Sequence, residues 1–374
     1  MEYYPGREPW DKTIKVFAAS WGTETPDIGD IEDPVKQELH RKRARAKGGI
    51  DDIDEKMAAA KAVYQQIVHP ERGINPEESL FLKSVFDNVT AQIGDPGKKC
   101  TVHVPIEVKD WNMEETDPRK LDRNALSTLF SLQLAADLDK MAKKAGWGNL
   151  DFSAKEKRII KISRSVISKH YKRGDADVYG RFAGQVRYDA DQFEEGDLVI
   201  VPDDHIQTGA SPKAMIDALK RRGCKVLGVA TLSCHPEAKN LWPDDKVRDG
   251  LDTALGCCVR IHNPEVDEQQ SNKLLRKYKE DLDAALGQLK LSVDNLTNRE
   301  LLTLMGLFIH NSKQEYVDFF ERMKECAGVD PHIIERPGDS LKELIGREAI
   351  TPARFGINLK EEIEKIMGTK TVEK

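Results

Sequence analysis

The sequence predicts an α/β fold with a parallel, doubly wound sheet, and three observations support this. From Lys99 onward, apolar runs of strand length alternate with longer runs at helical spacing, which is typical of strands joined by crossover helices. Turn-forming residues, such as those at 94–97, separate these runs. Of the 374 residues, 39% are hydrophobic and 33% are charged, which favours a chain that folds around a core over a disordered one.

Residues 1–98 predict one strand and two helices. The apolar run from Ile14 to Ala19 can form a strand, and helix-like stretches follow at 53–67 and 77–91. We interpret this part as an N-terminal α+β extension that is a candidate hood over a binding site. The basic octet HRKRARAK at 40–47 lies between acidic stretches, so it fits a solvated surface and leaves phosphate contacts open.

Residues 99–265 are predicted to form the sheet core. The expected strands are 101–108, 150–152, 197–201, 225–232 and 257–261. The expected helices are 125–145, 154–172, 212–222 and 245–254. The segment 178–188 resembles a mobile hairpin or loop, because glycines interrupt it. Cys257 and Cys258 are then expected to be core residues of the last strand.

Residues 266–374 are predicted to form a C-terminal helical region. Highly charged runs with helical periodicity lie near 268–290, 297–308 and 313–326. Together with the first 98 residues, this region leaves more than half of the chain outside the predicted core.

Composition excludes several classes of function. Lys and Arg number 58 against 64 Asp and Glu, so the net charge of −6 is too mild for a general nucleic-acid binder, although a local basic patch stays open. No run approaches the ~20 apolar residues of a membrane helix, and no stretch of signal-peptide type is present, so we expect a cytoplasmic protein without a membrane partner. The six cysteines lack Cys-x-x-Cys spacing, which predicts reduced thiols and no structural metal. A homodimer is compatible with the sequence.

The run LVIVPDDHIQTGAS, at 198–211, carries the chemistry. A buried strand delivers Asp203 and Asp204 at its carboxyl end, where open α/β sheets place their ligands. The turn that follows enters a helix, with Ser211 as its expected cap and Pro212 at the first helical position. Backbone amides converge at that turn and favour an anion, whereas the two acids need a hydroxylated or metal-bound neighbour. A ribose 5-phosphate supplies both.

This run resembles the 5-phosphoribosyl-1-pyrophosphate (PRPP) motif of type I phosphoribosyltransferases, in which four apolar residues, two acids and three variable residues precede Thr-Gly-x-Thr/Ser. The resemblance implies the parallel, doubly wound sheet of that family over about 99–265. It implies that Asp203 and Asp204 hold the ribose hydroxyls in catalysis. It also implies that Mg²⁺ arrives with PRPP and lies near these acids. The residues implied to bind the 5-phosphate are Thr208, Gly209, Ala210 and Ser211.

Three positions depart from the family pattern. Pro202 stands where an aliphatic residue is preferred, and since proline lacks an N–H group we expect the strand to end or kink there. Gln207 stands where the members acting on 6-oxopurines carry an acid, which makes that substrate class less expected. His205 is more polar than the usual residue; it can assist substrate binding and proton transfer or face solvent.

Two further loops follow from the resemblance. A pyrophosphate-binding loop is expected at 110–123, where Arg119, Lys120 and Arg123 can contact phosphate; it lacks the family's glycine-bearing turn, and its charges equally fit a plain surface. A mobile basic loop is expected at 168–189, and the alternative there is an exposed hairpin. Its candidate pyrophosphate ligands are Lys169, Lys172, Arg173 and Arg181.

Three functions stay open. The first is a PRPP-dependent pentosyltransferase that makes or breaks an N-glycosidic bond to a base-like acceptor, with pyrophosphate as co-product. The second is a non-catalytic sensor of PRPP or a nucleotide, which the atypical pyrophosphate loop favours. The third is a nucleic-acid-associated protein that uses residues 40–47 and the charged tail. Fold alone does not choose among them.

Overall fold

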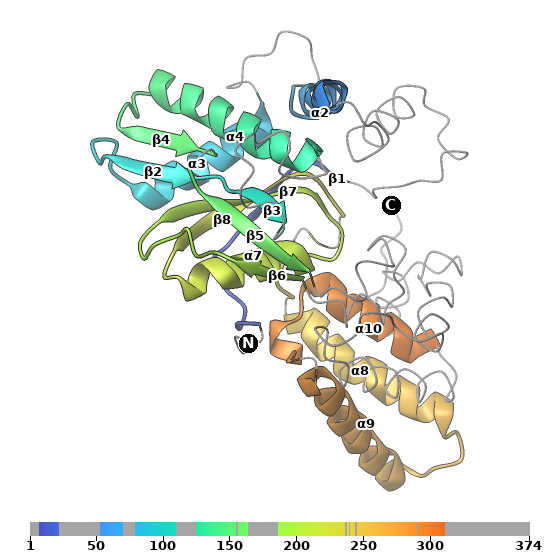
Figure 1. Ribbon diagram of the computed structural model, residues 1–374. Coiled ribbons are helices and arrows are strands. Elements are labelled where there is room, and N and C mark those ends of the chain that lie inside the picture. Colours follow the sequence, from blue (N-terminus) through green and yellow to red (C-terminus); the bar gives the residue numbers. More distant parts are fainter. Residues whose placement is uncertain are drawn as a thin grey trace, which may run out of the picture. The chain divides into compact units, whose positions relative to one another are not determined.

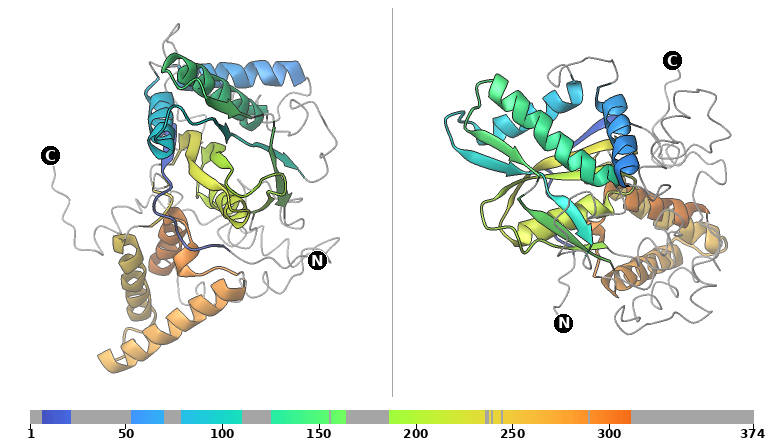
Figure 2. Two further views of the ribbon diagram at one scale, coloured as in Figure 1. Left: turned by 90° about the vertical axis from the view of Figure 1, so that its left-hand side faces the viewer. Right: turned by 45° about the horizontal axis from the view of Figure 1, so that its top comes forward.

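A computed structural model describes residues 7–21, 53–69, 79–109, 125–154, 156–163, 186–235, 238, 240–243, 245–288 and 290–310 (Figures 1 and 2). The chain divides into two compact units. The sheet unit comprises Asp11–Ile162 and Arg187–Leu241. The helical unit comprises Met1–Trp10, Ser163–Val186 and Trp242–Lys374. The two units are therefore interleaved along the chain, and each is described by itself.

A five-stranded parallel sheet forms the centre of the sheet unit, in the order β1-β8-β7-β2-β4. This confirms the predicted α/β class and the parallel sheet. β1, from the range predicted to be an N-terminal extension, is an edge strand of this sheet and pairs with β8. The five strands are β1 (Val16–Trp21), β2 (Cys100–His103), β4 (Leu150–Ser153), β7 (Leu198–Ile206) and β8 (Lys225–Cys234).

A second sheet has three strands in the order β3-β5-β6, namely β3 (Ile106–Lys109), β5 (Arg158–Ser163) and β6 (Val186–Asp189). The single strand predicted at 101–108 is thus two strands in different sheets, interrupted at Val104 and Pro105, and Pro105 has no N–H group for a ladder.

The helix predicted at 154–172 is wrong over 158–163, which form β5. Its adjacent residues Ile159 and Ile160 pair in parallel with Glu107 and Val108 of β3. Two neighbouring β-branched residues suit a pleated strand with both faces covered, and this tertiary pairing decides against the helix. The rest of that range, 164–172, lies outside the described residues.

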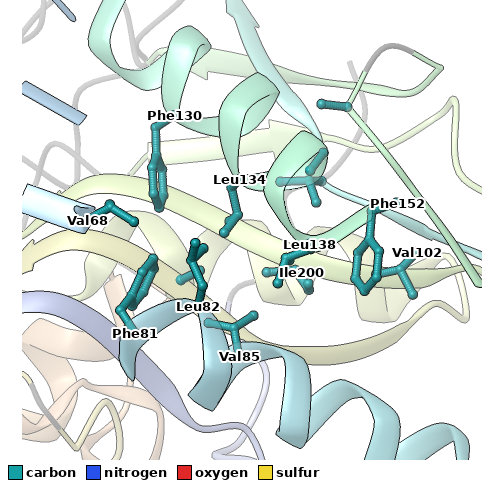
Figure 3. Packing of buried hydrophobic residues seen from close by; sticks show 14 of the residues in the cluster. Val68, Phe81, Leu82, Val85, Val102, Phe130, Leu134, Leu138, Phe152 and Ile200 are labelled. Atoms are coloured by element: carbon teal, nitrogen blue, oxygen red, sulfur yellow. The ribbon is translucent and has the colours of Figure 1, made fainter. Parts of the chain in front are cut away.

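Helices cover both faces of the five-stranded sheet. α2 (Ile53–Val68), α3 (Leu80–Ile93) and α4 (Ala125–Lys144) share one core cluster with residues of β2, β4, β7 and β8. In Figure 3, Leu134 and Leu138 of α4 and Val85 of α3 gather around Ile200 of β7. The helix predicted at 125–145 is confirmed as α4. α7 (Ala210–Arg221) packs on β7 and β8, and its buried Met215, Ile216 and Leu219 are not part of that cluster.

The helical unit is built on three helices, α8 (Asp245–His262), α9 (Glu268–Gln288) and α10 (Asn298–His310), whose apolar faces form a second cluster. The helices predicted at 268–290 and 297–308 are confirmed, and the run 313–326 lies outside the described residues. The strand predicted at 257–261 is wrong, because these residues continue α8. The buried positions of α8 recur at helical spacing and include Leu251, Ala254, Leu255, Cys258 and Val259.

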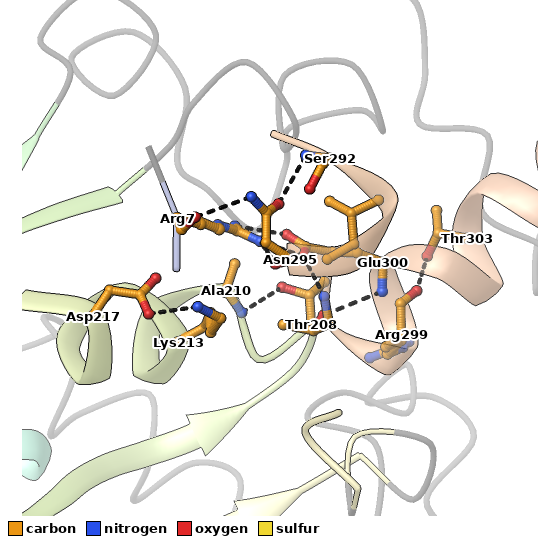
Figure 4. A network of polar contacts seen from close by, with 12 residues as sticks. Arg7, Thr208, Ala210, Lys213, Asp217, Ser292, Asn295, Arg299, Glu300 and Thr303 are labelled. Atoms are coloured by element: carbon orange, nitrogen blue, oxygen red, sulfur yellow. Dashed lines mark hydrogen bonds and ion pairs between the residues drawn. The ribbon is translucent and has the colours of Figure 1, made fainter. Parts of the chain in front are cut away.

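A buried polar network joins the first described residues to the start of α10 (Figure 4). The Arg7 guanidinium donates to both carboxylate oxygens of Glu300, with Nη1–Oε2 at 2.6 Å and Nη2–Oε1 at 2.9 Å. Asn295 Nδ2 donates to the carbonyl oxygen of Arg7 at 3.1 Å. Thr297 N donates to Glu300 Oε2 and Glu300 N donates to Thr297 Oγ1, a reciprocal capping box. Residues 7–10 therefore belong structurally to the C-terminal helices.

The described cysteines are free thiols: Cys100, Cys224, Cys234, Cys257 and Cys258. Burial raises the pKa of Cys224 to about 11 and that of Cys258 to about 12, which keeps both protonated at neutral pH. Within the described ranges, no helix is long and apolar enough to cross a membrane.

Candidate functional site

The strand predicted to carry the acids, β7, is longer than expected. It passes through Pro202, reaches Ile206 and stays paired with β8 to its last residue, so the expectation that it ends at Pro202 is wrong. β2, on the other side of β7, pairs only with Leu198 and Val199. The proline therefore stands where this side of β7 is already an edge, and its missing N–H group interrupts no ladder there.

The carboxyl half of β7 lies beside the point where the strand order of the sheet reverses. The crossover from β2 through α4 leads outward to β4, whereas the crossover from β7 through α7 leads the other way to β8. The reversal falls between β2 and β7. Open α/β sheets bind ligands outside the carboxyl ends of their strands at such a point. The fold therefore brings Asp203 and Asp204 to the position where this class of sheet carries its site.

The two acids are partly exposed and differ in their surroundings. Asp203 Oδ1 accepts a hydrogen bond from His205 N at 3.0 Å, which fixes the carboxylate close to its own backbone. Because a carboxylate has about four lone-pair positions, Asp203 keeps acceptor capacity for hydroxyl groups. Successive side chains of a strand point to opposite faces, so Asp203 and Asp204 lie on opposite faces of the sheet.

His205 is held by the neighbouring strand. Its Nδ1 lies 2.7 Å from Ser233 Oγ, and the two residues are register partners in the parallel ladder of β7 and β8. Ser233 is buried, and Thr231 Oγ1 donates to its carbonyl oxygen at 2.8 Å. Sequence reasoning missed Ser233. The signal available was the pair of hydroxyl residues, at 231 and 233, that interrupts an otherwise apolar strand.

The turn after β7 leads directly into α7. Gly209 has a φ of 82°, in the left-handed region that favours glycine, and serves as the N-cap, so α7 begins at Ala210. The predicted cap at Ser211 is therefore wrong, since Ser211 and Pro212 are the second and third helical residues. Gly209 has no side chain to bond the first amides of α7, a geometry suited to an anion. Ala210 N approaches Thr208 Oγ1 at 3.4 Å.

A buried ion pair lies in the first turns of α7, where Figure 4 shows Lys213 beside Asp217. Both residues are almost fully buried, and Lys213 N also donates to the Gly209 carbonyl oxygen at 3.0 Å. The i, i+4 spacing of this pair is visible in the sequence, but the pair was not predicted. The Lys213 ammonium and the Asp217 carboxylate therefore lie within α7, just after the turn that precedes the helix.

The structure brings together the residues predicted at 203–211 and does not test the others. Gln207 is partly exposed between His205 and the turn. The seven candidate phosphate ligands predicted in the two other loops lie outside the described residues, namely Arg119, Lys120, Arg123, Lys169, Lys172, Arg173 and Arg181.

The donor set suits a magnesium ion carried by a substrate. In the part of the chain that the structure describes, no group of three or more His, Cys, Asp or Glu residues could hold a metal ion. Mg²⁺ prefers oxygen ligands and is commonly held by one or two carboxylates together with substrate phosphates. Asp203 and Asp204 are each a carboxylate of the kind that such a site uses, although the two lie on opposite faces of the sheet.

Comparison with protein-family models and with curated proteins found no match for this chain.

Proposed function

We propose that this protein is a PRPP-dependent enzyme of the type I phosphoribosyltransferase kind. It binds PRPP or a nucleoside 5-monophosphate and makes or breaks an N-glycosidic bond to a base-like acceptor, with pyrophosphate as co-product. The observation that carries the proposal is the acid pair on β7 beside the strand-order reversal, followed within six residues by a left-handed glycine that opens α7.

The turn at 208–211 is the proposed 5-phosphate site. The first amides of α7 point toward the space before the helix, and the helix dipole adds partial positive charge there. A side chain at position 209 would adopt a strained backbone and occupy the space where a phosphate approaches. Thr208 and Ser211 add hydroxyl donors within the same turn.

The acids are proposed to stabilise charge at the reacting carbon, and the basic residues are proposed to stabilise charge on the leaving pyrophosphate. As the acceptor nitrogen bonds to the anomeric carbon, the bond from that carbon to the pyrophosphate oxygen breaks, and its electron pair leaves with pyrophosphate. The carboxylates of Asp203 and Asp204 place negative charge near a carbon that becomes positive. Magnesium bound with the substrate would neutralise charge on the leaving group, and the basic residues expected at 119–123 and 169–181 would supply further positive charge. His205 and Gln207 are proposed to contact substrate beside the acids.

A pyrophosphate-release assay tests this proposal. The purified full chain is mixed with Mg²⁺, PRPP and a panel of free bases, and PRPP binding is followed in parallel by calorimetry. Release that depends on one base, with a sharp loss in Asp204→Asn, supports the enzyme. PRPP binding without release from any base replaces it with the non-catalytic sensor. Salt-dependent binding of DNA or RNA without PRPP binding replaces it with the nucleic-acid function.

A further inference from the structure

Three short connections join the five-stranded sheet to the three-stranded sheet. The first leads from β2 through Val104 and Pro105 to β3, the second from β4 to β5, and the third from β6 to β7. Residues of one side-chain cluster lie on the second and third connections and directly before the first. We call this set the junction cluster, and its members are His103, Glu156, Lys157, Phe193 and Asp197.

His103, at the carboxyl end of β2, is the centre of the junction cluster. Its side chain is only 8% exposed. Its Nε2 lies 3.7 Å from Asp197 Oδ1, and its Nδ1 lies 3.8 Å from Glu156 Oε2. Both separations exceed hydrogen-bond distance, and the described residues supply no hydrogen bond to Nδ1. The ring also stands edge-on to the buried ring of Phe193, with centroids 6.2 Å apart. A buried imidazole therefore lies between two carboxylates without a hydrogen bond to either.

An ion pair beside His103 links the second connection to the third. Lys157 Nζ donates to Asp197 Oδ2 and lies 5.6 Å from the centroid of the Phe193 ring. Glu194 N donates to the same Asp197 oxygen at 2.8 Å. Lys157 comes directly before β5, and Asp197 comes directly before β7. The pair therefore ties the beginning of a strand in one sheet to the beginning of a strand in the other.

A proton on His103 changes the balance of charge in the junction cluster. The neutral imidazole leaves the Asp197 carboxylate to Lys157, whereas an imidazolium places a second cation against that carboxylate, in a position where burial penalises charge. Burial lowers the pKa of His103, Lys157 lowers it as well, and Asp197 and Glu156 only partly oppose this. A protonated His103 is therefore better accommodated when the junction opens to water.

The three-stranded sheet is the part of the unit best placed to respond. Within the described residues, its strands pair with one another and none pairs with the five-stranded sheet. Ile106 and Ile160 are its described members of the buried core cluster. A region with few buried apolar contacts opens at a lower free-energy cost than central strands do. Loss of the junction contacts should therefore release this sheet before it disturbs β7 and β8.

We propose that the junction cluster is a proton-sensitive hinge. With His103 neutral, it holds the three-stranded sheet against the five-stranded sheet. When His103 takes up a proton, the junction loosens and the three-stranded sheet moves as one piece. This inference goes beyond the proposed function, because it involves no ligand and none of the residues at 203–211.

Hydrogen exchange of the full chain at pH 7.5 and 5.5, corrected for the intrinsic effect of pH on amide exchange, tests the hinge. From the higher to the lower pH, exchange of β3, β5 and β6 should become about three- to tenfold faster together, while that of β8 changes by less than about twofold. The upper limit follows because an exposed imidazole with a pKa of about 6.5, taking up one proton on opening, shifts the opening equilibrium by at most about tenfold over this range.

Variants of the junction cluster should change this acid response in different directions. His103→Gln takes up no proton and should remove the response. Glu156→Gln removes an attraction for the imidazolium and should enlarge the response toward the tenfold limit. Lys157→Gln removes the ion pair and a repulsion, so exchange of the three-stranded sheet should already be faster at pH 7.5 and should rise less in acid. His69→Gln is the matched control and should leave the response unchanged, because His69 is a partly buried histidine beside Asp137, outside the junction cluster.

Equal acceleration of the three-stranded sheet and β8 would overturn the hinge, as would an undiminished acid response in His103→Gln. If His103→Gln does not fold, Glu156→Gln decides, since its side chain is 63% exposed and a response that it fails to enlarge would overturn the hinge. None of these outcomes bears on PRPP binding, which the pyrophosphate-release assay tests separately.

Discussion

The two units of this protein place polar side chains in contrasting ways. In the helical unit, Arg7, Asn295 and Glu300 are buried and bonded to one another at the start of α10. In the sheet unit, Asp203 and Asp204 are partly exposed at the carboxyl end of β7, beside the strand-order reversal. A buried network whose members satisfy one another stabilises structure, whereas partly exposed acids at a sheet edge are placed to meet a ligand.

This contrast predicts opposite responses to substitution. Removing a member of the Arg7 network should lower the free energy of unfolding. Ligand binding at β7 can then be measured on the protein that remains folded. Removing an acid on β7 should change ligand binding and leave the free energy of unfolding nearly constant.

The largest effect is expected from Glu300→Ala. It leaves the Arg7 guanidinium buried without its carboxylate and breaks the capping box, so the free energy of unfolding should fall by about 3–5 kcal/mol. Hydrogen exchange of α10 amides in increasing denaturant measures the loss locally. The double variant Arg7→Met/Glu300→Leu removes both charges and should lose much less. A loss in the double variant as large as in Glu300→Ala would show that the pair itself, rather than the uncompensated charge, controls stability.

The next effect concerns backbone conformation and is expected to differ in sign between the units. Gly209→Ala in the turn before α7 forces a side chain into the left-handed region, which should cost about 1–2 kcal/mol and weaken PRPP binding. Gly256→Ala in α8 is the control, because Gly256 is helical and a Cβ there meets open space; it should stabilise by about 0.5–1 kcal/mol. Thermal unfolding with and without PRPP measures both. Stabilisation by Gly209→Ala would contradict the cap geometry.

Acid should weaken the sheet unit at a higher pH than the helical unit. Burial lowers the pKa of His103 on β2, and Asp197 and Glu156 only partly oppose that shift. The unfolded chain therefore takes up this proton first, and stability falls as the pH drops below about 6.5. For Glu300, burial alone would raise the pKa, but Arg7 and the Thr297 hydrogen bonds outweigh it and lower it. Its contribution is present above pH ~4.5 and is lost as the pH falls through the lower, folded-state pKa.

Hydrogen exchange at pH 7, 5.5 and 4 separates the two responses. The variants His103→Gln and Glu300→Gln should each remove the pH dependence of their own unit. Simultaneous weakening of β2 and α10 at one pH would show that these two groups do not set it.

The sequence predicted what depends on local pattern. The helix at 125–145 and the acid-bearing strand were found because their apolar spacing and their turns agree with the tertiary structure. At 158–163 an apolar pair was compatible with either state, and pairing with β3 made it a strand. At 257–261 the run was compatible with a strand, but its burial continues the helical spacing of α8.

For the site, too, the sequence predicted only what depends on local pattern. The sequence predicted the two acids after a buried apolar run and a glycine in the turn, but Asp203 and Asp204 lie within β7 rather than beyond its end. The partnership of His205 with Ser233 depends on strand register, which joins residues 28 positions apart. The extension of β7 past Pro202, which places the two acids on opposite faces, depends on β2 leaving the ladder after Val199. Neither is encoded in a local pattern.

The smallest effect on stability is expected at the acids themselves. Asp203→Asn and Asp204→Asn keep the shape of each side chain, and both positions are partly exposed, so each should change the free energy of unfolding by less than about 0.5 kcal/mol. Urea unfolding of the two variants beside the unsubstituted chain measures this, and the same samples serve for the PRPP measurements. A loss of about 2 kcal/mol or more in either variant would make that acid a structural residue, like Glu300. Near-constant stability together with lost ligand binding would show that the acids bind a ligand. A group that stabilises a ligand rather than the fold can be removed without unfolding the protein.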